Sequence, residues 1–280
     1  MANVTVTTSA NFVPELWSME ILEAYLAEAV IASLVDRKFE AGVKEKGDTI
    51  HVPNLAAMTV GTKTAGTAVT FSANTENKTD ISIDQNKYVA FRIDNIAEVQ
   101  SQQALRQMYT GRAGRDLADT IDAALGDQMD NFAQTVGTLL ADVTDDDLIR
   151  SAQYLNDANA PIDSRSLIVS PATLSSIQKI DKFVRLDYHN IAGETAVERA
   201  LMTQPIYGAK TYVTTNVNGD NTLGHKNAMF QKEAIALVMQ QEPKTFSDFS
   251  VEYIAAEVVV EAIYGIAEMR DTSGVELSGK

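Results

Sequence analysis

The sequence predicts an α+β fold in which one long helix and one long two-stranded excursion accompany a mixed region of helices and strands. Three observations indicate this fold. Apolar and polar residues alternate between residues 46 and 94, as in strands with one buried face. A helical repeat of apolar residues then runs from about 96 to 136 without a proline. After it, helical and strand patterns follow one another to the end of the chain.

The N-terminal segment predicts an amphipathic arm. Ser18 can cap a helix in which apolar residues recur at three- and four-residue spacing as far as Leu34. Trp17, the only tryptophan of the chain, stands just before this helix. Two interpretations remain open for Trp17: an anchor in the core of its own chain, and a contact with another subunit.

The excursion is expected to have well-patterned strands and a tip that cannot bury itself. Apolar and polar residues alternate in its strands around Ile50–Val52 and Ile81–Ile83. The tip, in contrast, is rich in Gly, Ala, Thr and other small or polar residues. An isolated two-stranded arm is marginally stable, so we expect residues 60 to 80 to become ordered on a neighbouring subunit. Phe71 is our candidate anchor for that contact; the alternative is a phenylalanine packed inside its own hairpin.

The long helix contains two glycines near its middle. A helix over 96 to 136 would span about 60 Å, more than a compact core of this size needs. Gly111 and Gly114 each cost the helix about 1 kcal/mol relative to alanine. They therefore mark either a close helix contact or a bend, and we name both as candidate hinges.

The acidic triplet at 145 to 147 raises the question of a metal site. A helix N-terminus is the better interpretation, because Thr144 can cap a helix over 145 to 158 and carboxylates favour the first turn. A strand over 166 to 170 and a helix from Pro171 follow. Later strands are expected at 210 to 214, 234 to 239 and 251 to 262. Residues 216 to 227 are expected to be a turn, because they lack the Gly and Glu of a calcium loop.

Composition and motifs point away from catalysis. The chain has no cysteine, which excludes disulfides and thiolate chemistry, and its three histidines are scattered. It has no P-loop, dinucleotide fingerprint, nucleophile elbow or zinc-protease motif. The formal net charge of −15 opposes binding to nucleic acid phosphates. We therefore predict no catalytic residue, no cofactor and no metal, and we expect neither a signal peptide nor a membrane span.

The order of these patterns resembles the major capsid protein of tailed bacteriophages, the Hong Kong 97 type of shell subunit. The resemblance divides the chain into an N-terminal arm (1–45), an extended β loop (46–94), a spine helix with part of a peripheral domain (95–165), an axial domain (166–250), and C-terminal strands that return to the peripheral domain (251–280). The segments that carry it are Lys46-Gly47-Asp48-Thr49, Ser166 to Pro171, Ile206 to Lys210, Phe230 to Leu237, Tyr264-Gly265, Glu268-Met269-Arg270 and Gly274 to Leu277.

The resemblance implies a structural subunit that assembles with many copies of itself into an icosahedral shell around double-stranded DNA. DNA would be enclosed without sequence-specific binding, and no membrane would be involved. The location would be the virion, after assembly in the host cytoplasm. Implied partners are a portal, a decoration protein and a scaffolding protein. Many relatives carry a scaffolding segment before the arm, whereas here the arm begins within about the first dozen residues, which implies a separate scaffolding protein or prior removal of that segment. Lys63 lies near the expected loop tip, but no cross-linking partner can be assigned, so cross-linking is not predicted.

Two other functions remain open at this stage. An encapsulin-type bacterial nanocompartment shares the fold and encloses protein cargo. An acidic enzyme without a recognisable motif is the alternative from a different functional class. Particle size separates the enzyme from the two shell proteins.

Overall fold

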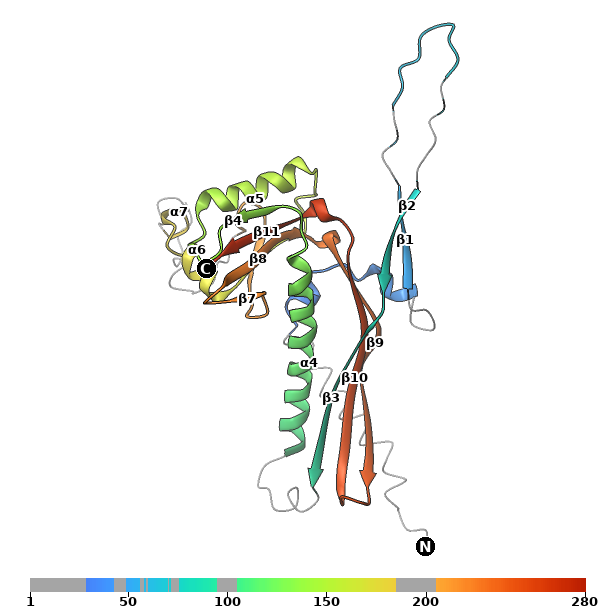
Figure 1. The fold of residues 1–280 in the computed structure, drawn as a ribbon, viewed down its shortest axis with the longest axis vertical. Helices are drawn as coiled ribbons and strands as arrows, with labels where there is room; N and C mark the ends of the chain where they lie inside the picture. The colour runs from blue at the N-terminus through green and yellow to red at the C-terminus, as the bar shows by residue number, and fades with distance from the viewer. Residues whose placement is uncertain are drawn as a thin grey trace.

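The computed structural model describes residues 29–42, 49–55, 58, 60–69, 71, 76–94, 105–184 and 205–280. They form an elongated body, a compact body beside one end of its helix, and an excursion that projects beyond both (Figure 1). The α-helices and strands are β1 (Thr49–Leu55), β2 (Glu76–Ser82), β3 (Gln85–Asp94), α4 (Leu105–Met129), β4 (Thr135–Gly137), α5 (Asp145–Asp157), β5 (Arg165–Val169), α6 (Pro171–Ile177), α7 (Asp181–Val184), β6 (Lys210–Val213), β7 (Gly219–Asp220), β8 (Gly224–Gln231), β9 (Ile235–Ser250), β10 (Ala255–Glu268) and β11 (Gly274–Gly279). Short 3₁₀ turns are η1 (Ile31–Ser33), η2 (Lys38–Gly42), η4 (Lys232–Ala234) and η5 (Asp271–Ser273).

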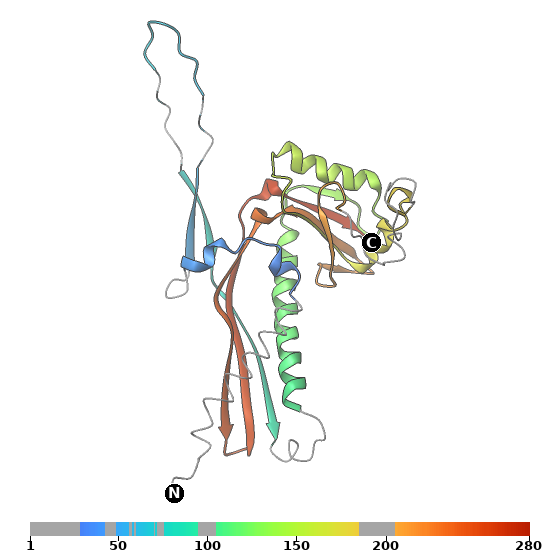
Figure 2. The ribbon, with the colours of Figure 1, turned by 180° about the vertical axis from the view of Figure 1, so that it is seen from behind.

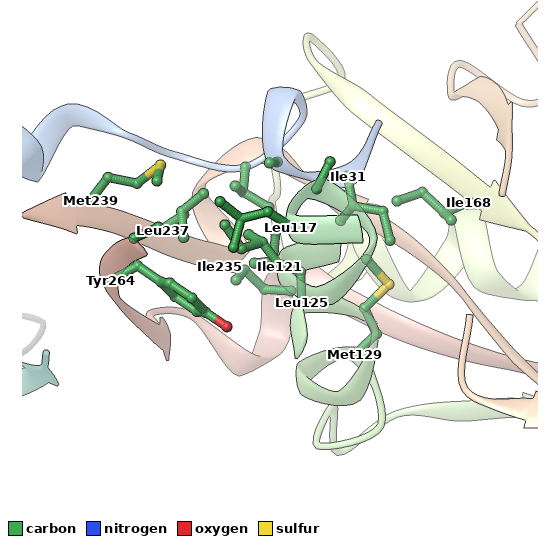
Figure 3. Close-up of a cluster of buried hydrophobic side chains, with 14 of the residues drawn as sticks. Ile31, Leu117, Ile121, Leu125, Met129, Ile168, Ile235, Leu237, Met239 and Tyr264 are labelled. Carbon is green, nitrogen blue, oxygen red and sulfur yellow. The ribbon is translucent and has the colours of Figure 1, made fainter. Parts of the chain in front are cut away.

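The elongated body is a three-stranded antiparallel sheet, in the order β3-β10-β9, with α4 packed on one face. Val258, Val260, Ala262 and Tyr264 of β10 alternate with more exposed residues and point into the core. The buried stripe of α4 meets them through residues spaced four apart (Figure 3). The stripe consists of Leu117, Ile121, Leu125 and Met129.

The compact body is a mixed sheet in the order β4-β11-β8-β5-β6, with β7 paired to β8. Strand β5 is buried throughout because both faces of the sheet are covered. Leu167 and Val169 belong to the cluster that α5 and α6 cover, whereas Ile168 belongs to the cluster of α4. Thr144 and Asp147 form a reciprocal capping box at the start of α5, which confirms the helix N-terminus expected at the acidic triplet.

The excursion rises from a buried foot. Strands β1 and β2 pair antiparallel, and Ile81 of β2 is fully buried against Ala236 and Val238 of β9. Beyond the foot, the excursion extends past both bodies in two opposite views (Figure 1, Figure 2). Its base is therefore fixed to the elongated body, while its tip is carried away from it.

Two predicted elements differ from the observed ones. The helix expected over about 96 to 136 is described only from 105 to 129, about 37 Å long, and residues 95 to 104 lie outside the described part. The apolar repeat continued past the helix end because Phe132 packs against Phe230, and Val136 pairs with Leu277 in β4. The pattern at residues 85 to 94 belongs to β3 of the body sheet and not to the excursion.

Sheet membership also differs from the division drawn at residue 250. Strand β9 pairs with β10 and lies in the elongated body, not with residues 166 to 231. Strand β11 pairs with β4 and β8 and lies in the compact body. The reason is that the chain passes from one sheet to the other at η4 and again at η5, so strands that follow one another in sequence belong to different sheets.

Candidate assembly surfaces

The tip of the excursion exposes large apolar side chains to solvent. Phe71 is 92% exposed and Val60 is 95% exposed, and Met58 and Val69 are exposed with them. Phe71 therefore does not pack inside its own hairpin, which was the alternative interpretation of this residue. A polar tip with a few fully exposed apolar residues is a surface suited to contact with another molecule.

Charged side chains occupy the solvent face at the foot of the excursion. His51 and Asp80 are direct partners across β1 and β2, with 2.5 Å between His51 Nδ1 and Asp80 Oδ1. Lys78 Nζ lies 3.0 Å from the same carboxylate. The hydrogen bond from His51, and then the one from Lys78, lower the pKa of Asp80. These pairs favour the register that buries Ile81 on the opposite face of β2.

A second apolar surface lies at the end of the β9–β10 hairpin. Val251 is 81% exposed, and Phe249, Tyr253 and Ile254 are exposed beside it. This end and the excursion tip lie at opposite ends of the long axis of the molecule (Figure 1). This surface could not be predicted from the sequence, because residues 251 to 254 contain no Gly, Pro, Asn or Asp and have the composition of a strand.

The geometry of this hairpin end is held by specific contacts. Ile254 has a φ of 51°, a left-handed conformation that is strained for a β-branched residue. The guanidinium carbon of Arg92 lies 3.9 Å from the centroid of the Tyr253 ring. Arg92 also pairs with Glu257 at 2.6 Å. These contacts hold Tyr253 against the sheet through Arg92.

A buried carboxylate fixes the segment that precedes the excursion. Asp122 of α4 is fully buried, and its Oδ2 accepts the N–H groups of Val30 at 2.7 Å and Ile31 at 3.1 Å. Its Oδ1 accepts the N–H of Ala32 at 3.0 Å. Burial raises the pKa of Asp122, and the three N–H donors act in the opposite direction. Four residues later, Asp36 forms a parallel bridge with Ala236 of β9, so this segment is tied to both sides of the core.

The remaining predicted residues are placed as follows. Trp17 lies outside the described residues, as does most of the expected arm. Gly111 and Gly114 are both in α4; Gly114 is buried, and a Cβ added to Gly111 would meet no atom within 4 Å. Close helix packing therefore does not explain Gly111 in the single chain.

The described ranges contain no group of three or more His, Asp or Glu side chains that could hold a metal ion. No helix within these ranges is both long and apolar enough to cross a bilayer.

Comparison with known proteins identifies the fold. No family model matches the sequence, and no curated protein matches it either. Among solved structures, one from Mycobacterium phage Che8 superposes with a TM-score of 0.77 and 25% identity, covering 89% of this chain and 90% of that one. The capsid structure of the cyanophage P-SCSP1u gives a TM-score of 0.70 and 17% identity over 84% of each chain. A virus-like particle from Pyrococcus furiosus gives 0.63 and 12% identity, over 94% of this chain and 98% of that one.

These likenesses extend over 84 to 94% of this chain. They agree with the fold that the order of sequence patterns predicted. The chain therefore has the Hong Kong 97-type fold of tailed-bacteriophage major capsid proteins.

Proposed function

We propose that this chain builds the closed icosahedral shell of a tailed phage virion, and that its excursion is the clamp between neighbouring copies. The observation that supports the clamp is the contrast between the two ends of the excursion. Ile81 at the foot is fully buried in the chain's own core, whereas Val60 and Phe71 near the tip are almost fully exposed. An element anchored in one subunit with apolar residues at its far end is suited to binding the next subunit.

The hairpin end of β9 and β10 is the second surface in this proposal. It lies at the other end of the molecule, where the acidic residues Asp94, Asp248, Glu252 and Glu257 accompany Arg92. Contact between copies here would draw on the apolar side chains, because the surrounding charge is predominantly negative. Each copy then has an apolar contact surface at both ends, as a lattice requires.

The contents and partners of the shell form the finer part of the proposal. The net charge of −15 suits a container for double-stranded DNA, because an acidic wall does not hold the phosphate backbone. The tailed-phage fold also implies a separate scaffolding protein, a portal and a decoration protein as partners, with assembly in the host cytoplasm.

An encapsulin-type nanocompartment is the second candidate, favoured by the likeness to the virus-like particle of Pyrococcus furiosus. The two differ in what they enclose. Purified particles that contain a packaged protein and no phage DNA would favour the nanocompartment, and particles filled in vivo with double-stranded DNA would favour the virion.

Shortening the excursion tests the clamp. Deleting residues 62 to 76 should leave a folded, soluble subunit, because the buried foot is retained, but the yield of stable particles should fall. Phe71→Ser should act in the same direction, with Thr62→Ser in the same exposed loop as the matched control. Circular dichroism reports on the fold, and sedimentation reports on particle yield. Unchanged particle yield and stability in the deletion variant would show that the excursion is not a clamp.

A further inference from the structure

The segment between β6 and β7 attaches the compact body to the side of α4. Val217, at its centre, is buried in the cluster that contains the apolar stripe of α4. On either side of Val217, an asparagine donates its side-chain amide to a carboxylate. Asn216 donates to Asp119 in α4 at 3.2 Å, and Asn218 donates to Asp130, the residue after α4, at 2.5 Å. The two asparagines therefore fasten the same segment to the same helix.

The two asparagines differ in the residue that follows each of them. Asn218 precedes Gly219, and this is the only Asn-Gly step in the sequence, whereas Asn216 precedes Val217. Asparagine is thermolabile, because the main-chain nitrogen of the next residue attacks its side-chain carbon. A β-branched neighbour hinders this attack, and glycine hinders it least. Of this pair, Asn218 is the one whose sequence favours the reaction.

The fold itself requires the glycine after Asn218. Gly219 has a φ of 107°, a conformation that residues with a side chain rarely adopt. A Cβ at this position would also collide with the carbonyl oxygen of Gly224. The turn therefore cannot carry a bulkier residue that would protect Asn218.

The attacking nitrogen of Gly219 is accessible in the folded chain. Asn218 and Gly219 are both exposed. The N–H of Lys226 donates to the carbonyl of Asn218 at 2.9 Å, next to the pair of Gly219 with His225 in β7 and β8. In an antiparallel ladder, this bond makes the Gly219 pair a non-hydrogen-bonded one, so the N–H of Gly219 points away from β8. Within the described chain, β7 pairs with no other strand.

We propose that Asn218 is a site of spontaneous deamidation and that its conversion loosens the attachment of this segment to α4. The nitrogen of Gly219 forms a bond to Cγ of Asn218, the bond from Cγ to Nδ2 breaks, and the proton of the Gly219 N–H leaves with the amide as ammonia. Water then opens the resulting cyclic imide. Attack at Cγ gives aspartate, and attack at the main-chain carbonyl carbon gives isoaspartate.

The contacts of Asp130 explain why the product should be released. Its Oδ2 accepts from Asn218 at 2.5 Å and from Lys226 Nζ at 3.2 Å. Its Oδ1 is buried and accepts no hydrogen bond from the described residues. Deamidation replaces a donor with a second carboxylate, which repels the first. The inference concerns the single subunit and goes beyond the proposed shell function.

Ageing of the folded protein tests the reaction. The full-length, unassembled subunit is incubated in warm, mildly alkaline buffer and digested at low pH, and the peptide that contains both asparagines is sequenced by mass spectrometry. Aspartate and isoaspartate should accumulate at Asn218 severalfold faster than at Asn216, which is the internal control. A folded subunit in which Asn218 stays unchanged, or reacts no faster than Asn216, would overturn the proposal.

Hydrogen exchange tests the structural consequence. Asn218→Asp reproduces the aspartate product, so the protection of the Lys226 N–H should fall severalfold. Asn86→Asp adds the same charge at an exposed position in β3 and is the matched control, with no loss expected. Adding Asp130→Asn to Asn218→Asp exchanges the donor and the acceptor and should restore the protection.

Unchanged protection in Asn218→Asp would contradict the proposed loosening. So would an equal loss in the Asn86→Asp control, or a loss that Asp130→Asn fails to reverse. Because all of these measurements use the unassembled subunit, their outcome is independent of whether shells form.

Discussion

The carboxylate of Asp122 accepts the main-chain N–H of Ile31 at 3.1 Å, across 91 positions of sequence. With the bonds to Val30 and Ala32, this one side chain receives three N–H groups that no helix or sheet partner satisfies. Ile31 then lies over Leu117 in the core (Figure 3). The start of the described chain is thereby fixed to the middle of the long helix.

Asp122→Ala should therefore destabilise the subunit. It leaves buried main-chain donors without an acceptor, at about 1 to 3 kcal/mol for each unsatisfied group, so we expect a loss of about 3 kcal/mol in the free energy of unfolding. Urea denaturation of the subunit measures it. Asp127→Ala, on the exposed face of the same helix, is the control and should change stability by less than about 0.5 kcal/mol. Equal effects of the two substitutions would contradict the role of Asp122.

A close approach between Gly274 and the ring of Phe132 gives the next prediction. A Cβ on Gly274 would lie 2.2 Å from two atoms of the Phe132 ring, which itself packs against Phe230. Gly274→Ala should cost about 1 to 3 kcal/mol through forced displacement of that ring. Gly61→Ala is the matched control, because a Cβ there meets no atom within 4 Å. Thermal unfolding compares the two variants, and an unchanged midpoint for Gly274→Ala would mean that the ring moves aside freely.

Replacing the glycines of α4 with alanine should stabilise the subunit but impair assembly or expansion of the shell. Since a Cβ on Gly111 has open space, Gly111→Ala should stabilise the helix by about 1 kcal/mol. If Gly111 and Gly114 are hinges, the double alanine variant should nevertheless assemble or expand poorly, because a stiffer helix resists bending. Unfolding of the subunit and electron microscopy of particles are the two measurements. Normal particles that expand normally would leave the glycines without a hinge function.

Much of the fold could be predicted from the sequence because local physics and tertiary structure agree there. The Thr144 cap, the buried β5 and the Pro171 helix start were each encoded within a few residues. The end of α4 could not be located in this way. Phe132 and Val136 continue the apolar spacing of the helix, but their partners Phe230 and Leu277 are distant in sequence.

Of the two candidate surfaces, only the tip of the excursion could be predicted from the sequence. Phe71 stood out because the residues around it are polar. The end of the β9–β10 hairpin did not, because Ile254 adopts a left-handed conformation that its side chain disfavours.

Particle mass tests the central claim most directly. The purified protein should be examined by light scattering and negative-stain electron microscopy, with and without a candidate scaffolding protein. We predict hollow, closed particles of uniform size built from many copies of this 30.4 kDa chain. A stable, compact monomer under every assembly condition, with the excursion protected from protease, would contradict the account.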